Sequence, residues 1–307
     1  MKRAVSVSIG SSKRDKVVEI ELLGEKVRLE RIGTDGSLEK AAKLFEEMDG
    51  KVDAFGVGGT NLGSMVGDWW VPLKSIAPMV RGVRKTPIVD GTGLKVTSEG
   101  KVAQAVEGIV DEIGEGFSRK AMFTAAIDRW GTVRSFLDAG YECCFCDFMF
   151  GLGIPIPVYT ERMLMVLARI LLPIVFRLPF HWIYPTGEAQ EEIVPKWGKY
   201  YQWASVIAGD CHYILHNMPP DLSGKVIVTN TTTVEDRDIF KKAGVKYLVT
   251  TTPILEGRSF GTNMMEAALV AASGRTEPVD YANPGTYFEE IEKMVGELGF
   301  QPQVQEL

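Results

Sequence analysis

The residue best placed for acid–base chemistry is Asp90. It follows the apolar segment 86–89 and precedes Gly91, so a ligand can approach its carboxylate closely. Such an aspartate can orient an alcohol or accept its proton. Lys95 and Lys13 are the candidates to exchange that proton, although a lysine more often lies at the surface. An Asp-Gly pair is also a common turn, and that alternative stays open.

A second acid, Asp147, ends a strand–helix–strand pattern. Residues 121–127 are apolar, a turn closes at Gly131, a helix is expected over 132–139, and a second strand follows over 141–146. This order is typical of the first βαβ half of a dinucleotide-binding fold. There a helix N-terminus faces a pyrophosphate and a strand-end acid binds a ribose. The turn has one glycine where the usual fingerprint has three.

This pattern predicts a cofactor site for NAD. A carboxylate at position 147 repels a 2′-phosphate, which favours NAD, whereas Arg129 or Arg134 could pair with that phosphate and favour NADP. A helix cap is the alternative role of Asp147. The candidate cofactor-binding residues in this half are Asp128, Arg129, Trp130, Gly131 and Asp147.

Three later segments, 204–208, 226–231 and 247–251, are also expected to be strands with polar ends. The first is followed by Gly209, Asp210 and His212. An imidazole exchanges protons near neutral pH, so His212 is a candidate acid or base, with packing or capping as the alternative.

The next strand end carries Asn230 and Thr231, whose amide and hydroxyl groups can bind a ribose or a polyol. Threonine is also a good strand former, so its presence alone is weak evidence of a site. Arg258 can bind a carboxylate through two hydrogen bonds, or it can pair with Glu256 or Glu266.

Apolar segments alternate with helical patterns along the whole chain, which predicts an α/β protein with two domains. We expect an N-terminal α/β substrate-type domain over 1–115 and a Rossmann-like doubly wound parallel sheet over 116–275. A C-terminal tail with one helix is expected over 276–307. In the first domain, strand ends offer further candidate substrate-binding residues, which are Ser11, Ser12, Lys13, Thr60 and Asn61.

Two short motifs resemble the shikimate and quinate dehydrogenase family. Residues 89–93 (VDGTG) look like that family's T-D-G-x-G segment, and residues 261–264 (GTNM) are similar to its G-L-G-M segment. The resemblance implies that Asp90 belongs to a catalytic Lys/Asp pair and that Met264 closes over the substrate. The family's N-V-T-x-P-x-K segment corresponds to GVGGTNL at 56–62, which has no lysine.

The leading functional hypothesis is therefore an NAD(P)-dependent oxidoreductase that acts on a small hydroxy acid, such as quinate or shikimate, in an interdomain cleft. Asp90 would orient the alcohol, and Lys95, Lys13 or His212 would take its proton. Arg258 would hold the carboxylate. Alternatives are an S-adenosylmethionine-using enzyme on the same scaffold and a non-catalytic small-molecule sensor.

The composition of the chain limits the kinds of partner that we expect it to bind. A net charge of −6 and a pI near 5.3 argue against nucleic acid. The basic N-terminus lacks the features of a signal peptide, and the apolar segment 163–176 is shorter than the ~20 residues of a membrane span. We expect this segment to be buried or to form a homo-oligomer surface. The spacing of the four cysteines predicts no metal site, and reduced thiols suit a cytoplasmic protein.

Overall fold

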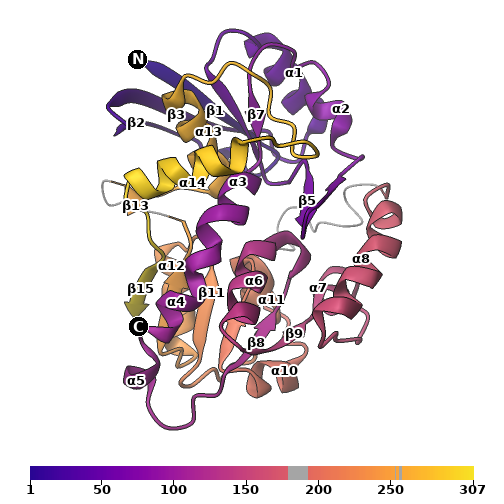
Figure 1. Cartoon of the computed structure of the whole chain (residues 1–307), viewed down its shortest axis with the longest axis vertical. Coiled ribbons are helices and arrows are strands. Elements are labelled where there is room, and N and C mark those ends of the chain that lie inside the picture. The colour runs from indigo at the N-terminus through magenta and orange to yellow at the C-terminus, as the bar shows by residue number, and fades with distance from the viewer. Residues whose placement is uncertain (179–192, 253, 256–257) are drawn as a thin grey trace. The chain divides into compact units, whose positions relative to one another are not determined.

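The computed structural model describes residues 1–178, 193–252, 254–255 and 258–307 (Figure 1). They form two compact α/β units that are interleaved along the chain. The described part of unit 1 comprises residues 1–97, 172–178, 255 and 258–300, and that of unit 2 comprises 98–171, 193–252, 254 and 301–307. The α/β class and two-unit organisation expected from the sequence are confirmed.

Unit 1 is built on a five-stranded sheet in the order β2-β3-β1-β4-β7. Strand β1 pairs in parallel with β3 and β4, β4 pairs in parallel with β7, and β2 is an antiparallel edge strand. The apolar residues of β2 alternate with charged ones, so that one face of the strand is buried. The strands are β1 (Lys2–Ser8), β2 (Lys16–Leu22), β3 (Glu25–Gly33), β4 (Ala54–Gly58) and β7 (Ile88–Val89).

Shorter elements surround this sheet. Ser37 caps α1 through a hydrogen bond from the Lys40 backbone N–H. A hairpin of β5 and β6 and a second small ribbon of β13 and β14 complete the strands of the unit. These elements are η1 (Ser12–Arg14), α1 (Leu38–Met48), β5 (Gly63–Val66), β6 (Trp69–Pro72), α2 (Ala77–Val80), α3 (Thr92–Thr97), β13 (Ile254–Leu255), β14 (Arg258–Ser259) and α14 (Tyr287–Glu297).

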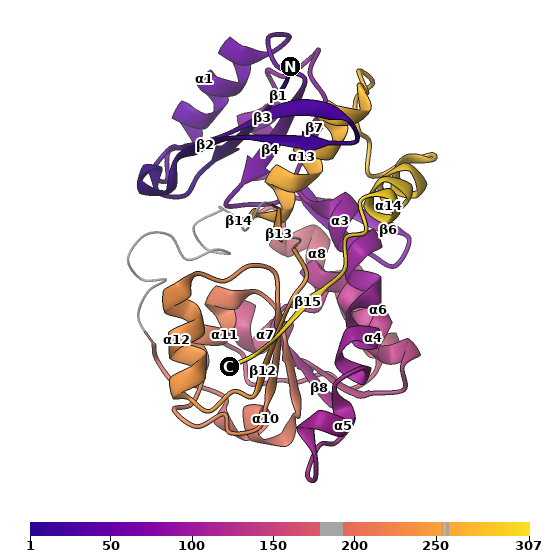
Figure 2. The same cartoon turned by 90° about the vertical axis from the view of Figure 1, so that its left-hand side faces the viewer.

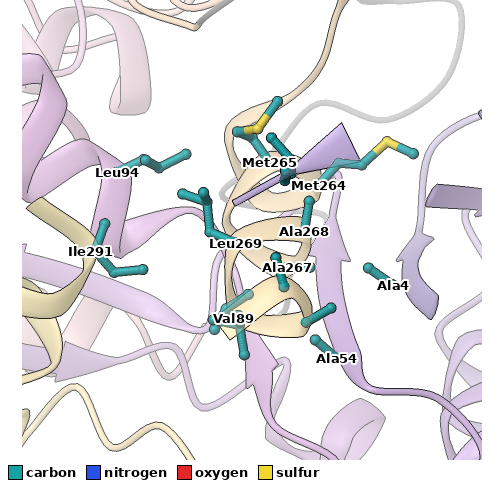
Figure 3. Close-up of a cluster of buried hydrophobic side chains, with 14 of the residues drawn as sticks. Ala4, Ala54, Val89, Leu94, Met264, Met265, Ala267, Ala268, Leu269 and Ile291 are labelled. Atoms are coloured by element: carbon teal, nitrogen blue, oxygen red, sulfur yellow. The ribbon is translucent and has the colours of Figure 1, made fainter. Parts of the chain in front are cut away.

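Helix α13 (Thr262–Ser273) forms the centre of the unit 1 core. Figure 3 shows its side chains between Ala4 and Ala54 on one side and Leu94 and Ile291 on another. The helix approaches β4 so closely that a Cβ at Gly56 would lie 2.8 Å from the backbone oxygen of Asn263. Small and apolar residues around the whole circumference of the helix fit this buried position.

Unit 2 contains a six-stranded sheet in the order β15-β12-β11-β10-β8-β9. The five strands from β12 to β9 are parallel, and β15 pairs antiparallel with β12. Figure 2 shows α11 and α12 on one side of the sheet and α4 and α6 on the other. The strands are β8 (Lys120–Phe123), β9 (Glu142–Phe145), β10 (Val206–Ala208), β11 (Val226–Thr229), β12 (Tyr247–Thr250) and β15 (Gln303–Glu306).

Read across the sheet from β9 to β12, the five parallel strands are the second, first, third, fourth and fifth of the unit in chain order. This 2-1-3-4-5 arrangement is one of the two common doubly wound orders. The winding direction therefore reverses between β8 and β10. The helices of the unit are η2 (Ser98–Lys101), α4 (Val102–Glu107), α5 (Val110–Ile113), η3 (Ile127–Arg129), α6 (Trp130–Asp138), α7 (Asp147–Leu152), α8 (Glu161–Val175, which continues into unit 1), α10 (Gly198–Trp203), α11 (Cys211–Asn217) and α12 (Val234–Lys242).

The unit boundaries differ from the linear division 1–115, 116–275 and 276–307. Helix α13, which was assigned to the second domain, packs on β1 and β4 of unit 1, and α4 packs on α6 of unit 2. The tail is likewise shared, because α14 packs on α3 of unit 1 while β15 extends the unit 2 sheet. An apolar helix can cover either sheet, and nothing in its own sequence specifies which one. Among the described helices, none is long and apolar enough to cross a membrane.

Candidate functional site: the carboxyl edge of the unit 2 sheet

The loops after β8 and β10 lie at the point where the winding of unit 2 reverses. Gly209, directly after β10, has a φ of +151°, and a Cβ there would lie 1.9 Å from the Thr124 hydroxyl. Only glycine allows the two loops to approach this closely. In open α/β sheets, ligands bind in the crevice at such a reversal, outside the carboxyl ends of the strands.

Arg129 is the centre of a buried ionic network in this region. Its guanidinium forms an ion pair with Glu99, which is fully buried, and lies 3.7 Å from Asp128 and 3.9 Å from Asp210. Burial alone would lower the pKa of Arg129, but the charge of Glu99, followed by those of Asp128 and Asp210, raises it. The network therefore holds three carboxylates around one permanent cation.

Hydrogen bonds extend this network across the sheet. Glu99 accepts hydrogen bonds from the hydroxyls of Thr132 at 2.8 Å and Thr251 at 3.3 Å. Asp210 caps α11 by accepting the His212 backbone N–H at 3.0 Å, and its other oxygen accepts the side-chain amide of Asn230 at 3.2 Å. Residues that follow β8, β10, β11 and β12 are thus joined in one polar cluster.

Asp147 does not stand at a free strand tip as expected. It begins α7, and its Oδ1 accepts the backbone N–H of Ile127 at 2.9 Å, so it closes the turn that was predicted to face a pyrophosphate. Burial, assisted by the nearby charge of Asp128, raises the pKa of Asp147 to about 6 against opposing backbone hydrogen bonds. Asp147 does not cap α7 either, because the N-cap of that helix is Cys146 and no described side chain accepts a capping hydrogen bond there.

The described residues include seven buried side-chain polar atoms without a hydrogen-bond partner. Three of these atoms, Ser75 Oγ, His216 Nδ1 and Glu266 Oε2, lie elsewhere, and the other four lie at this edge. These four are the Thr124 hydroxyl, the Arg129 Nε, the Asp147 Oδ2 and the Thr252 hydroxyl. A buried polar group left unpaired costs about 1–3 kcal/mol, so such groups are uncommon in folded proteins. Four of them at the carboxyl ends of one sheet mark a place that can take a polar ligand.

The residues present do not fit the pyrophosphate of a dinucleotide. The backbone N–H of Ile127 already bonds a carboxylate, and Arg129 is engaged by Glu99. A phosphate would also meet Asp128 and Asp210, whose side chains are 25% and 28% exposed. Like charges at this range repel, so the edge disfavours an anionic ligand.

The other residues predicted for this site have simpler roles. Trp130 and Gly131 are buried in the first turn of α6, and Thr231 is half-buried after β11. His212 lies in the first turn of α11 with an exposed side chain, and its backbone N–H completes the cap. The residue that caps α11 is therefore Asp210, and the exposed His212 side chain neither caps the helix nor packs in the core.

A second polar cluster lies at the carboxyl edge of the unit 1 sheet. Asp90 is 2% exposed, and its two oxygens accept the backbone N–H groups of Leu62 at 2.6 Å and Thr92 at 3.0 Å. Lys95 is buried on α3, and its Nζ donates to Asn61 Oδ1 at 3.0 Å. The structure thus joins Lys95 to Asn61, and it joins Asp90 to the neighbouring residue Leu62. The Asp90 carboxylate, however, serves to fasten two loops.

Beneath Asp90 lies a buried carboxyl group that the sequence interpretation treated only as a partner for Arg258. Glu266 Oε1 accepts hydrogen bonds from the Gly93 N–H at 3.0 Å, the Tyr281 hydroxyl at 3.0 Å and the Tyr287 hydroxyl at 2.5 Å. Burial, and then the charge of Asp90, raises the pKa of Glu266 to about 7. A single acid within an otherwise apolar helix was the sequence signal for this cluster.

The remaining predicted substrate residues are dispersed. Ser11 caps η1, and both Ser12 and Lys13 are exposed. Thr60 is buried and donates to the Asn61 carbonyl at 3.3 Å. Met264 does not close over a substrate, because it is packed in the unit 1 core. The side chain of Arg258 lies outside the described residues.

Two family models match the sequence. The model described as DUF8754 matches residues 93–307, and the model described as DUF8753 matches residues 3–90. A search of curated proteins finds no match.

Several solved structures share low similarity with the chain. One from Mycobacterium smegmatis is 12% identical, covers 97% of each chain and has a TM-score of 0.34. A carbohydrate transporter solute binding protein from Agrobacterium radiobacter, in complex with D-arabinose, is 13% identical, covers 96% of this chain and 98% of its own, and has a TM-score of 0.33. Another M. smegmatis structure, in complex with β-D-fucofuranose, is 10% identical, covers 100% of this chain and 99% of its own, and has a TM-score of 0.32. Scores this low carry no functional weight.

Proposed function

The chain belongs to the DUF8754 family, and from the polar edge of its unit 2 sheet we propose that it binds a small, neutral polyhydroxy molecule of the sugar or polyol class. The observation that carries this proposal is the set of four unpaired buried polar atoms beside the half-buried Asp128 and Asp210. Thr124, Arg129 and Asp210 follow β8 and β10, the two strands between which the winding of the sheet reverses, which is the usual ligand position in such folds.

Hydroxyl groups suit this mixture of donors and acceptors. Asp128, Asp147 and Asp210 offer acceptor oxygens, whereas Arg129 Nε offers only a donor. A hydroxyl both donates and accepts, so several hydroxyls on one small molecule can satisfy both kinds of group. The excess of carboxylates over the single guanidinium favours a ligand without negative charge.

Isothermal titration calorimetry with a panel of monosaccharides and polyols tests this proposal, with NAD, NADP and S-adenosylmethionine as competing ligands. The matched pair of variants is Asp210→Asn and Asp111→Asn. Asparagine retains the cap of α11 but removes a charge-assisted acceptor, so we expect affinity for the polyol to fall roughly 10–100-fold. Asp111 is exposed on α5, which precedes β8 at the opposite edge of the sheet, and its variant should bind normally.

An NAD(P)-dependent oxidoreductase acting on a small hydroxy acid is the alternative proposal, in which unit 2 would be a Rossmann-like cofactor domain that holds the pyrophosphate against the opposing charges of Asp128 and Asp210. It is supported by the proximity of Asp90, Lys95 and Asn61 at the ends of β4 and β7. Reduction of NAD or NADP in the presence of quinate or shikimate, followed by absorbance, would favour it and would displace the polyol-binding proposal. The four cysteines are free thiols, which suits a cytoplasmic setting for either activity.

A further inference from the structure

Helix α8 is apolar on two opposite faces. Leu164, Ala168 and Leu172 form the buried face, with exposed fractions of 1%, 2% and 7%. A helix that is hydrophobic on all sides is normally buried on all sides. One face of α8 nevertheless remains uncovered by the described residues.

The uncovered face is a regular stripe. Its residues are Met163, Val166, Ile170 and Ile174, and each exposes between 47% and 58% of its surface. Their spacing of three, four and four residues places them within one narrow arc of the helix. This is the spacing with which a helix packs along another helix.

From this stripe we infer that α8 forms the interface of a homodimer, in which two copies of α8 pack against each other around a twofold axis. A stripe made entirely of apolar side chains can pack against a second copy of itself, as a twofold interface requires. An antiparallel pairing centred on the stripe also brings Arg162, which is exposed at the start of α8, to the C-terminal end of the partner helix. Cations are favoured at that end of a helix.

The exposed apolar area on and beside α8 is large enough for a second copy of the chain to bind there. The segment before α8 exposes four further apolar side chains at 41–54%, which are Leu152, Ile154, Ile156 and Tyr159. If each of the eight residues exposes about half of the ~200 Å² of a large side chain, they offer roughly 800 Å². That is about the area that one partner contributes to a standard stable interface.

The test is the molar mass in solution, measured by light scattering after size-exclusion chromatography of the full chain from ~1 to ~100 μM, the range of a moderately stable dimer. We expect twice the chain mass of 33.9 kDa. Val166→Glu and Ile170→Glu should each raise the dissociation constant at least about 100-fold, because a carboxylate would be buried without a partner.

Val234→Glu is the matched control. Val234 is 59% exposed at the start of α12, away from α8, and this variant should remain dimeric. Circular dichroism will show whether each variant is folded. A wild-type protein that is monomeric throughout the range would overturn the inference, as would dimers that persist in both α8 variants. Co-sedimentation of monomers with anionic lipid vesicles would instead identify the stripe as a membrane-binding face and would also refute the dimer.

Discussion

The two sheets carry similar polar residues at their carboxyl edges, but they use them differently. In unit 1, both oxygens of Asp90 accept backbone N–H groups, and the Ser8 hydroxyl accepts the Gly10 N–H and an Arg31 guanidinium N–H. In unit 2, Arg129 is surrounded by three carboxylates, and polar atoms nearby remain unpaired. Both oxygens of Asp90 are thus engaged by backbone groups, whereas Asp147 in unit 2 keeps one buried oxygen without a hydrogen-bond partner.

Among the substitutions that distinguish the carboxyl edges of the two sheets, we expect the largest change in stability at Arg129. Arg129→Met should lower the free energy of unfolding by about 3–5 kcal/mol, because it leaves Glu99 buried and unpaired. Arg134→Met is the control, since Arg134 pairs with Asp138 and Glu161 where all three side chains are 40–62% exposed. The loss of unfolding free energy in this variant should be much smaller, because water screens the exposed ion pairs of Arg134. Urea unfolding measures both variants, and equal losses would contradict the central role of Arg129.

The buried acid of unit 1 should make stability depend on pH. The pKa of Glu266 is about 7 in the folded protein, compared with 4.5 for the free group. At a pH between these two values, the carboxyl group is therefore protonated in the folded state and ionised in the unfolded state. Stability should therefore fall as pH rises from about 4.5 to 7, and little of this change should remain above that range.

Glu266→Gln removes this titration while keeping an acceptor for Tyr281 and Tyr287. Between pH 5 and pH 8, the stability of the variant relative to wild type should rise by up to about 3 kcal/mol. Chemical denaturation of both proteins at each pH gives this difference. A constant difference would show that Glu266 does not titrate in this range. Asp147 of unit 2 should contribute a dependence of the same sign at lower pH, because its pKa is raised to about 6.

A smaller effect is expected from Asp90→Asn. The side-chain amide can accept only one of the two backbone N–H groups, so stability should fall by about 1–3 kcal/mol. Affinity for a polyol in unit 2 should be unchanged in this variant, in contrast to Asp210→Asn. If the variant instead keeps full stability and abolishes an NAD(P)-linked turnover of quinate, Asp90 is a catalytic residue and the contrast between the two edges fails.

The sequence predicted the local elements of this fold better than their assembly. Apolar segments located β8 and β10, although the predicted segment 121–127 extends four residues beyond the end of β8. The assignment of α13 to unit 2 was wrong, because the choice between two apolar sheets depends on close contacts such as that of Gly56 with Asn263. Such contacts between distant segments leave no local pattern.

The same distinction applies to the candidate site. Polar strand ends correctly located Arg129, Asp210 and Asn230 at one edge, because parallel strands align their carboxyl ends. Glu99 was missed, since it lies in the turn before α4 and meets Arg129 only through the tertiary fold. The sequence left a ribose contact and a helix cap open for Asp147, and it did not predict the hydrogen bond from the Ile127 N–H that the structure shows.

The interleaving of the chain has a consequence for how the protein is made and handled. Residues 1–97 of unit 1 leave the ribosome well before α13, the helix that fills their core, and unit 2 acquires β15 only with residues 303–306. Domains that are continuous in sequence can fold one after the other during synthesis, but here each unit waits for a distant segment. Fragments cut near residue 92, between the two matched family models, would each lack part of a hydrophobic core. Expression of either fragment alone should therefore yield insoluble or chaperone-bound protein.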